Sequence, residues 1–121
     1  MKQENRSVED YITKDVCGVI SGFMSEHRAK GRAAGLTSIR AIVSIKEFRK
    51  RLRERIVGYR TMDDYGDPVM KALKRARVPS LVELRKKWLP AAFAQSEDAV
   101  ITEDAIEMTV VIPPSRKAHA R

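Results

Sequence analysis

The chain has 121 residues, of which 43% are hydrophobic, 33% charged and 6% aromatic. This length fits one domain with a single, mainly aliphatic core and is too short for two independent domains. The single cysteine rules out an internal disulfide, and no run approaches the ~20 apolar residues of a membrane-spanning helix, so we expect a cytoplasmic protein.

The net charge of +8 is concentrated in the middle of the chain. Residues 28–87 hold 18 basic and 6 acidic side chains, whereas residues 1–27 and 88–121 each hold 3 basic and 5 acidic ones. Such an asymmetry is typical of proteins that bind nucleic acid or another anionic surface. The alternative is a solvated basic surface with no dedicated ligand.

The first predicted element is an amphipathic helix over about residues 7–28. Ser7 and Asp10 have the spacing of an approximate capping box. The apolar residues that recur at helical spacing are Val8, Ile12, Val16, Val19, Ile20 and Phe23.

Three residues within this helix have structural interpretations. Gly18 and Gly22 are four residues apart, which predicts the close approach of another helix. Cys17 falls on the apolar run, so we expect a buried structural thiol and not a nucleophile. The small residues of the segment 29–35 predict the end of the helix and a connection.

A second amphipathic helix is predicted over about residues 39–59. Its apolar side chains fall within an arc of roughly 120° on a helical wheel. As an alternative, residues 39–45 are β-branched enough for a short strand, and Ser44 with Glu47 would then cap a helix that begins at Ile45. Continuity of the apolar arc favours the longer helix. The residues of the arc are Ile42, Ile45, Phe48, Leu52, Ile56 and Tyr59.

Two short helices, over about residues 68–77 and 81–89, are predicted to follow. Asp67 before a proline is a strong helix start, and Ser80 with Glu83 forms a capping box for the second helix. A tight turn would join them into the outline of a helix-turn-helix, although the turn lacks the usual glycine.

The C-terminal part becomes acidic and alternates apolar with polar residues, which predicts a strand or hairpin over about residues 99–112. The fold class is therefore mainly α, with four helices and a C-terminal strand in one domain over residues 1–112. Residues 113–121 are expected to form a flexible basic tail. A lone hairpin is marginally stable, so it should pack on the helices or form the contact of a homodimer.

The sequence supports no metal site and no cofactor, because one cysteine and two histidines do not supply a ligand set. Asp63, Asp64 and Asp67 could hold Mg²⁺ in a small nuclease. A turn rich in Asp and Gly is equally expected between two helices. We therefore expect no enzyme activity.

The basic residues of the central and the two short helices are the candidate binding side chains. Lys and Arg on such elements can neutralise phosphates, although the second short helix lacks the Asn or Gln that reads adenine. The candidates are Arg49, Lys50, Arg53 and Arg60 on the central helix, and Lys71, Lys74, Arg75, Arg77, Arg85, Lys86 and Lys87 around the short helices.

Taken as a whole, the sequence predicts a non-catalytic nucleic-acid-binding protein, with DNA preferred over RNA, that acts as a regulator. The alternative is a protein-interaction adaptor or inhibitor whose cationic face docks on an acidic protein. A basic amphipathic helix could also lie on anionic lipid, although no integral membrane association is expected.

Overall fold

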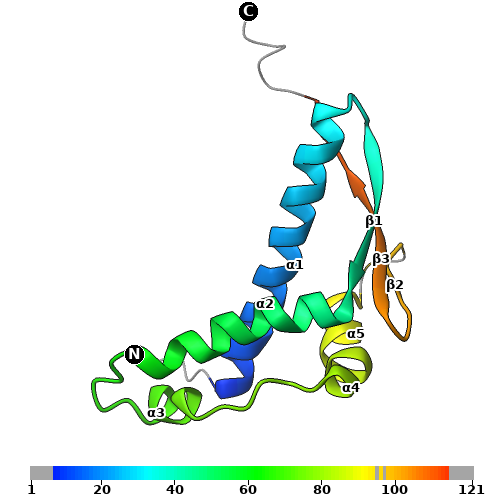
Figure 1. Cartoon of the computed structure of the whole chain (residues 1–121). Helices are drawn as coiled ribbons and strands as arrows, with labels where there is room; N and C mark the ends of the chain where they lie inside the picture. The colour runs from blue at the N-terminus through cyan, green and yellow to red at the C-terminus, as the bar shows by residue number, and fades with distance from the viewer. Residues whose placement is uncertain (1–6, 95, 97, 115–121) are drawn as a thin grey trace, which may run out of the picture.

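The computed structural model describes residues 7–94, 96 and 98–114. Most of the expected flexible tail, residues 115–121, lies outside this range. Figure 1 shows the order of the elements, which are α1 (Val8–Ala33), β1 (Ser38–Ser44), α2 (Ile45–Gly58), the short 3-10 helix η1 (Tyr59–Thr61), α3 (Pro68–Lys74), α4 (Leu81–Glu83), the π-helical turn η2 (Leu84–Trp88), α5 (Leu89–Ala92), β2 (Val100–Ile101) and β3 (Ala105–Val111).

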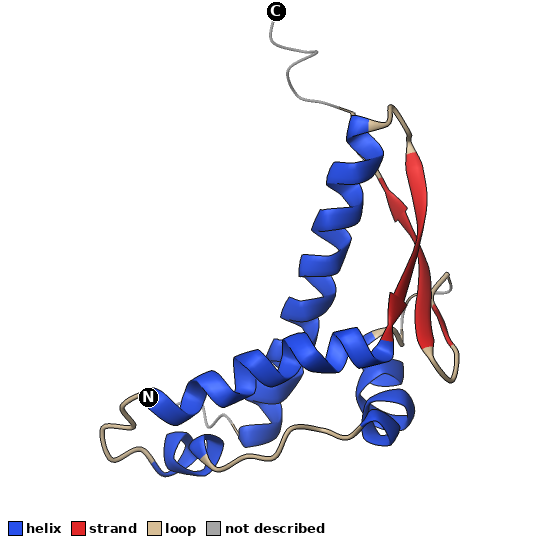
Figure 2. Cartoon of the chain, viewed as in Figure 1, coloured by secondary structure: helices blue, strands red, loops and turns tan. Residues whose placement is uncertain are grey.

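The fold is mainly helical with C-terminal strands, as the sequence predicts. Helices α1 and α2 form two arms that cross, and the strands lie beside one part of α1 (Figure 2). The core fills the space between α1, α2 and the inner face of the sheet, and α3 and η2 each contribute a leucine. Its largest fully buried side chains are Val16, Phe48, Leu52, Ile56, Leu73, Leu84, Leu89, Ile106 and Val110.

Helix α1 begins where the sequence predicts and ends later. The Ser7 Oγ accepts a hydrogen bond from the Asp10 N–H at 3.1 Å, and the Asp10 carboxylate accepts one from the Ser7 N–H at 3.0 Å, which is the predicted capping box. The helix continues through Gly31 to Ala33. Gly31 is buried, and a Cβ at this position would overlap the side chain of Ile112. The glycine therefore lets the helix lie against the end of β3 instead of ending it.

Two expectations about the middle of α1 need correction. Cys17 is exposed, and the prediction of a buried thiol is wrong. Close packing occurs at Gly18, where a Cβ would lie 2.5 Å from the Arg55 guanidinium, but nothing lies within 4 Å of the corresponding position at Gly22. The glycine pair thus contributes one close approach.

Residues 38–44 form a strand and not the first turns of the central helix. β1 pairs antiparallel with β3 along its whole length, from Ser38 opposite Val111 to Ser44 opposite Ala105. The Ser44 Oγ then accepts a hydrogen bond from the Glu47 N–H at 3.3 Å and caps α2. Pairing with β3, some 70 residues away in sequence, supplies a ladder of main-chain hydrogen bonds, so the apolar arc of the longer helix was misleading.

The sheet has three strands in the order β1-β3-β2, and β3 is its middle strand. The C-terminal hairpin is as predicted: β2 pairs antiparallel with β3, and Val100 lies opposite Glu107. In β1 the side chains alternate, so that Ala41 and Val43 are buried while Ile42 is 62% exposed. One face of the sheet therefore packs on α1, and the other faces solvent.

The predicted tight turn between the two short helices is wrong. α3 ends at Lys74 and α4 begins at Leu81, and residues 75–80 form an extended connection. Figure 1 shows α3 beside the C-terminal end of α2 and α4 beside its N-terminal end, with the connection running along α2. The two elements do not form a helix-turn-helix.

The last helical segment also continues beyond its predicted end, from Leu81 to Ala92. Its π-helical turn is marked by the Leu89 N–H, which donates to the Leu84 carbonyl five residues earlier. A proline inside a regular α-helix loses a hydrogen bond and clashes with the preceding turn. The wider π turn directly before Pro90 is where this helix departs from regular α geometry.

Candidate nucleic-acid interface

The cations of α2 divide into two groups, and the group facing α1 is neutralised. Arg51 forms a two-pronged ion pair with Glu26, at 2.6 and 3.0 Å, and lies 3.8 Å over the Phe23 ring. Hydrogen bonding from Arg51 holds the pKa of the Glu26 carboxyl below its ordinary value. Arg55 lies 3.6 Å from the Asp15 carboxylate. These two arginines hold α2 against α1 and are poorly placed to bind an external anion.

The second group, which we call the cationic stripe, lies along the opposite side of α2 and ends at Arg60 in η1. Within α2, spacings of three, four and seven residues place its four stripe cations within an arc of about 100° and along a length of about 11 Å. No acidic residue falls on this arc, and none of the five cations forms an ion pair within the described part of the chain. The stripe consists of Lys46, Arg49, Lys50, Arg53 and Arg60.

Part of the stripe lines an open groove of about 250 Å³ between α2 and the start of α4. Its apolar wall is Leu81, which is 37% exposed. The cationic wall is made of Lys46, Arg49, Lys50 and Arg53. An anion entering this groove meets several positive groups that need not break an internal ion pair first.

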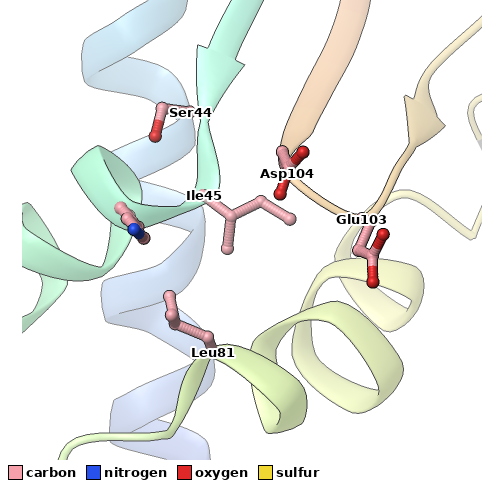
Figure 3. Close-up of a pocket in the computed structure, with 6 residues that line it drawn as sticks. Ser44, Ile45, Leu81, Glu103 and Asp104 are labelled. Atoms are coloured by element: carbon pink, nitrogen blue, oxygen red, sulfur yellow. The ribbon is translucent and has the colours of Figure 1, made fainter.

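A second hollow, of about 230 Å³, continues the groove at its N-terminal end (Figure 3). The two hollows share Lys46 and Leu81. Figure 3 shows Glu103 and Asp104 on the turn between β2 and β3, at the far side of this second hollow. The Ile45 N–H donates to the Asp104 carbonyl at 2.9 Å and fixes the turn there. These acids mark the boundary of the positive surface.

The connection of residues 75–80 is attached to the stripe by one hydrogen bond. The Arg49 Nε donates to the Pro79 carbonyl oxygen at 2.7 Å. Arg75 and Arg77, both exposed, lie on this connection. The fold therefore brings two arginines from outside α2 to the neighbourhood of the stripe, although the sequence placed them in a helical hairpin.

The remaining candidates are dispersed or neutralised. Lys74 pairs with Asp64 at 3.8 Å, and Lys87 pairs with Glu9 at 2.8 Å. The Lys87 ammonium also lies 4.6 Å from the centre of the Trp88 ring. Because α3 and the last helical segment lie at opposite ends of α2, their cations do not form one cluster. The other candidates on these elements are Lys71 and Lys86, which are exposed, and Arg85, which is half-buried.

No protein-family model, curated protein or solved structure matches this chain. No helix among the described residues combines the length and the apolar character that crossing a membrane requires.

Lys46 is the functional candidate that the sequence prediction missed. It precedes Arg49 by three residues and Lys50 by four, so a helical wheel of α2 alone places it on the stripe. For the neutralised cations, the sequence gives a local signal in the i,i+4 pair of Arg51 with Glu47, at 3.7 Å, but none for Glu26 and Asp15, which belong to a different helix.

The aspartates after α2 make local contacts with the main chain. Each carboxylate accepts a hydrogen bond from an N–H two residues further on, which is the usual role of Asp in turns and helix caps. Within the described residues, no group of three or more His, Cys, Asp or Glu side chains is arranged to hold a metal ion. The pairs are Asp63 with Tyr65, Asp64 with Gly66, and Asp67 with Val69, at 3.1, 2.8 and 2.9 Å.

Proposed function

We propose that this protein binds duplex DNA without catalysing a reaction on it and acts as a regulator by occupying its site. The observation that supports this proposal is the cationic stripe, whose cations are not neutralised within the described part of the chain. Lys and Arg that neutralise phosphates release condensed counterions, and this release supplies most sequence-independent affinity.

Two features favour a duplex over single strands as the ligand. Cations that repeat along about 11 Å of one face of α2 and continue to Arg60 in η1 suit the regular line of phosphates of a duplex strand. Binding of single strands relies on exposed aromatic rings on which bases stack. Tyr65 is 89% exposed, but it lies on the loop before α3, while Tyr59 and Trp88 are half-buried.

The test is the salt dependence of DNA affinity, measured by fluorescence anisotropy with a labelled duplex. About four phosphate contacts predict a loss of about 100-fold in affinity between 50 and 200 mM salt. The double variant Lys50→Ala and Arg53→Ala should bind more weakly and lower the slope of log affinity against log salt by about 1.8. Both side chains are exposed and form no ion pair within the described residues.

The matched control is the double variant Lys30→Ala and Arg32→Ala, which removes the same charge. Both residues are exposed on the last turn of α1, away from α2 (Figure 1). This variant should retain most of the affinity and of the slope. Equal slopes for the two double variants, or no binding at 50 mM salt, would show that the stripe is not a DNA site. Tighter binding to structured RNA than to duplex DNA would indicate that RNA, and not DNA, is the ligand.

One observation favours a second candidate function, an adaptor or inhibitor that docks on an acidic protein. Leu81 interrupts the positive surface with an exposed apolar side chain, which contributes nothing to the binding of phosphates. A protein partner could bury Leu81 while pairing its acids with the stripe. In that case Leu81→Ser should weaken capture of an acidic partner after nuclease treatment. Under the DNA proposal, the same variant should leave duplex affinity within about twofold.

A further inference from the structure

Half of the main-chain polar groups of β1 point toward an open sheet edge. The Thr37 carbonyl accepts from the Ile112 N–H, and the Ile45 N–H donates to the Asp104 carbonyl, so the odd-numbered residues of this segment bond to the β3 side. In an antiparallel pair the alternate residues then direct N–H and C=O outward. The outward groups of Ser38, Arg40 and Ile42 have no main-chain partner within the described residues, and at Ser44 the N–H also points outward, whereas its carbonyl caps α2 and accepts the first bond of that helix.

This edge lacks the usual features that prevent strand pairing. Natural sheets protect edges with prolines, bulges, very short strands or charged side chains. β1 has seven residues in unbroken register and no proline. Its one charge, Arg40, is compensated by Asp98 at 3.4 Å and Glu107 at 3.7 Å. Ile42 is exposed beside it. The edge is therefore long, regular and nearly neutral.

The sequence of β1, SIRAIVS, is nearly symmetric about its centre, Ala41. An antiparallel pairing with the same strand of a second copy, centred on Ala41, brings all seven residues into register. Ser38 then faces a serine, and Ile39 faces Val43 on the core side of the sheet. Arg40 faces Ile42 of the second copy. A shift that centres the pairing on Arg40 would place two arginines opposite each other, which is unfavourable.

We propose that β1 pairs with β1 of a second copy of this chain about a two-fold axis through Ala41. The two three-stranded sheets then become one sheet of six strands. The other strands do not offer this contact, because β3 is the middle strand and β2 has only two residues. The sequence predicts a dimer contact at the C-terminal strand. We propose instead that the contact is β1, the edge strand beside β3.

The first test is the mass of the full chain by size-exclusion chromatography with light scattering. High salt prevents bridging by bound polyanions, so the measurement is independent of DNA binding. The wild type should approach twice the monomer mass as its concentration rises. Ile42→Pro should remain monomeric, because it removes an outward N–H and leaves the bonds to β3 intact. Circular dichroism checks that this variant keeps its fold.

The matched control is Val111→Lys, on the same solvent-facing side of the sheet but on its middle strand. Val111 is 67% exposed and has no free edge. Edge pairing predicts that this variant still dimerises. A monomeric Val111→Lys would indicate that sheet faces stack, and a wild type that stays monomeric at all concentrations would also overturn the proposal.

Hydrogen exchange of the wild type provides a measurement that needs no variant. With rising concentration the amides of Arg40 and Ile42 should exchange at least tenfold more slowly, because they become bonded only in the dimer. The amides of Ala41 and Val43 already bond to β3 and should be protected at every concentration. Exchange at Arg40 and Ile42 that does not depend on concentration would contradict the pairing.

Discussion

The Tyr59 hydroxyl donates a hydrogen bond to the Asp15 Oδ2 at 2.8 Å and thereby joins the end of α2 to α1. Asp15 is 6% exposed and is the one buried charged side chain among the described residues. Arg55 approaches the other carboxylate oxygen at 3.6 Å. The Tyr11 ring packs edge-on against the Tyr59 ring, with centroids 6.4 Å apart. A buried carboxylate is tolerated here because it has both a donor and a cation.

Replacing Tyr59 by Phe should destabilise the fold by about 1–3 kcal/mol, because a buried carboxylate loses its hydroxyl donor. The free energy of unfolding in urea measures this loss. Tyr65→Phe is the matched control, since Tyr65 is 89% exposed and only its main-chain N–H is hydrogen-bonded. The control should change stability by less than about 0.5 kcal/mol. Equal effects of the two substitutions would show that the hydroxyl of Tyr59 is not important for stability.

The same contact predicts a dependence of stability on alkaline pH. Burial, followed by the hydrogen bond to Asp15, raises the pKa of Tyr59 to about 12. The fold therefore favours the neutral hydroxyl, and its contribution is complete below about pH 10 and is lost as pH rises toward 12. The stability difference between wild type and Tyr59→Phe should shrink over this interval. A difference that stays constant from pH 8 to 12 would contradict this assignment.

Local signals in the sequence predict the starts of α1, α3 and α4 correctly, but not the start of α2. A cap is formed by residues two or three positions apart, so a short window contains the whole interaction. The capping boxes at Ser7 and Ser80 and the aspartate cap at Asp67 all occur as predicted. The sequence predicts a longer helix in place of β1 because Ile42 and Ile45 fit the apolar arc of that helix. Only the pairing with β3 decides between the two, and no short window contains both strands.

For the candidate site too, local features could be predicted from the sequence and tertiary contacts could not. Positions on the cationic stripe follow from the period of the helix, so Lys46 and Arg53 could be placed together from sequence alone. The same period leaves Arg51 and Arg55 off the predicted face, but their ion pairs with Glu26 and Asp15 could not be predicted, because these acids lie 25 or more residues away on α1. Charge counts predict the sign of a surface, and tertiary contacts decide which charges remain available.

Two alanine substitutions within α1 should have opposite effects on stability. The Cβ added by Gly22→Ala has nothing within 4 Å, so this variant should stabilise the fold by about 0.5–1 kcal/mol, because alanine is the better helix former. At Gly31 the added methyl group would overlap Ile112, and overpacking should cost about 1–3 kcal/mol. Thermal or urea unfolding of both variants gives the sign directly. A stabilising Gly31→Ala would mean that Ile112 moves aside without loss.

Arg49 has two roles that a pair of charge-removing variants can separate. Its Nε bond to the Pro79 carbonyl attaches the connection of residues 75–80 to α2. A hydrogen bond from a charged donor contributes about 1.5–3 kcal/mol, so Arg49→Met should raise the population of a detached connection about tenfold or more. Trypsin cleavage after Arg75 and Arg77 should accelerate by the same factor, because cleavage follows the population of the open form.

Lys50→Met is the control for this variant. Lys50 lies on the same stripe, and no hydrogen bond joins it to the connection within the described residues. Both variants should lower the slope of log DNA affinity against log salt by about 0.9, the value for one phosphate contact. Only Arg49→Met should accelerate cleavage at Arg75 and Arg77. If Lys50→Met accelerates cleavage equally, loss of charge and not loss of the Pro79 bond releases the connection, and Arg49 has no special positioning role.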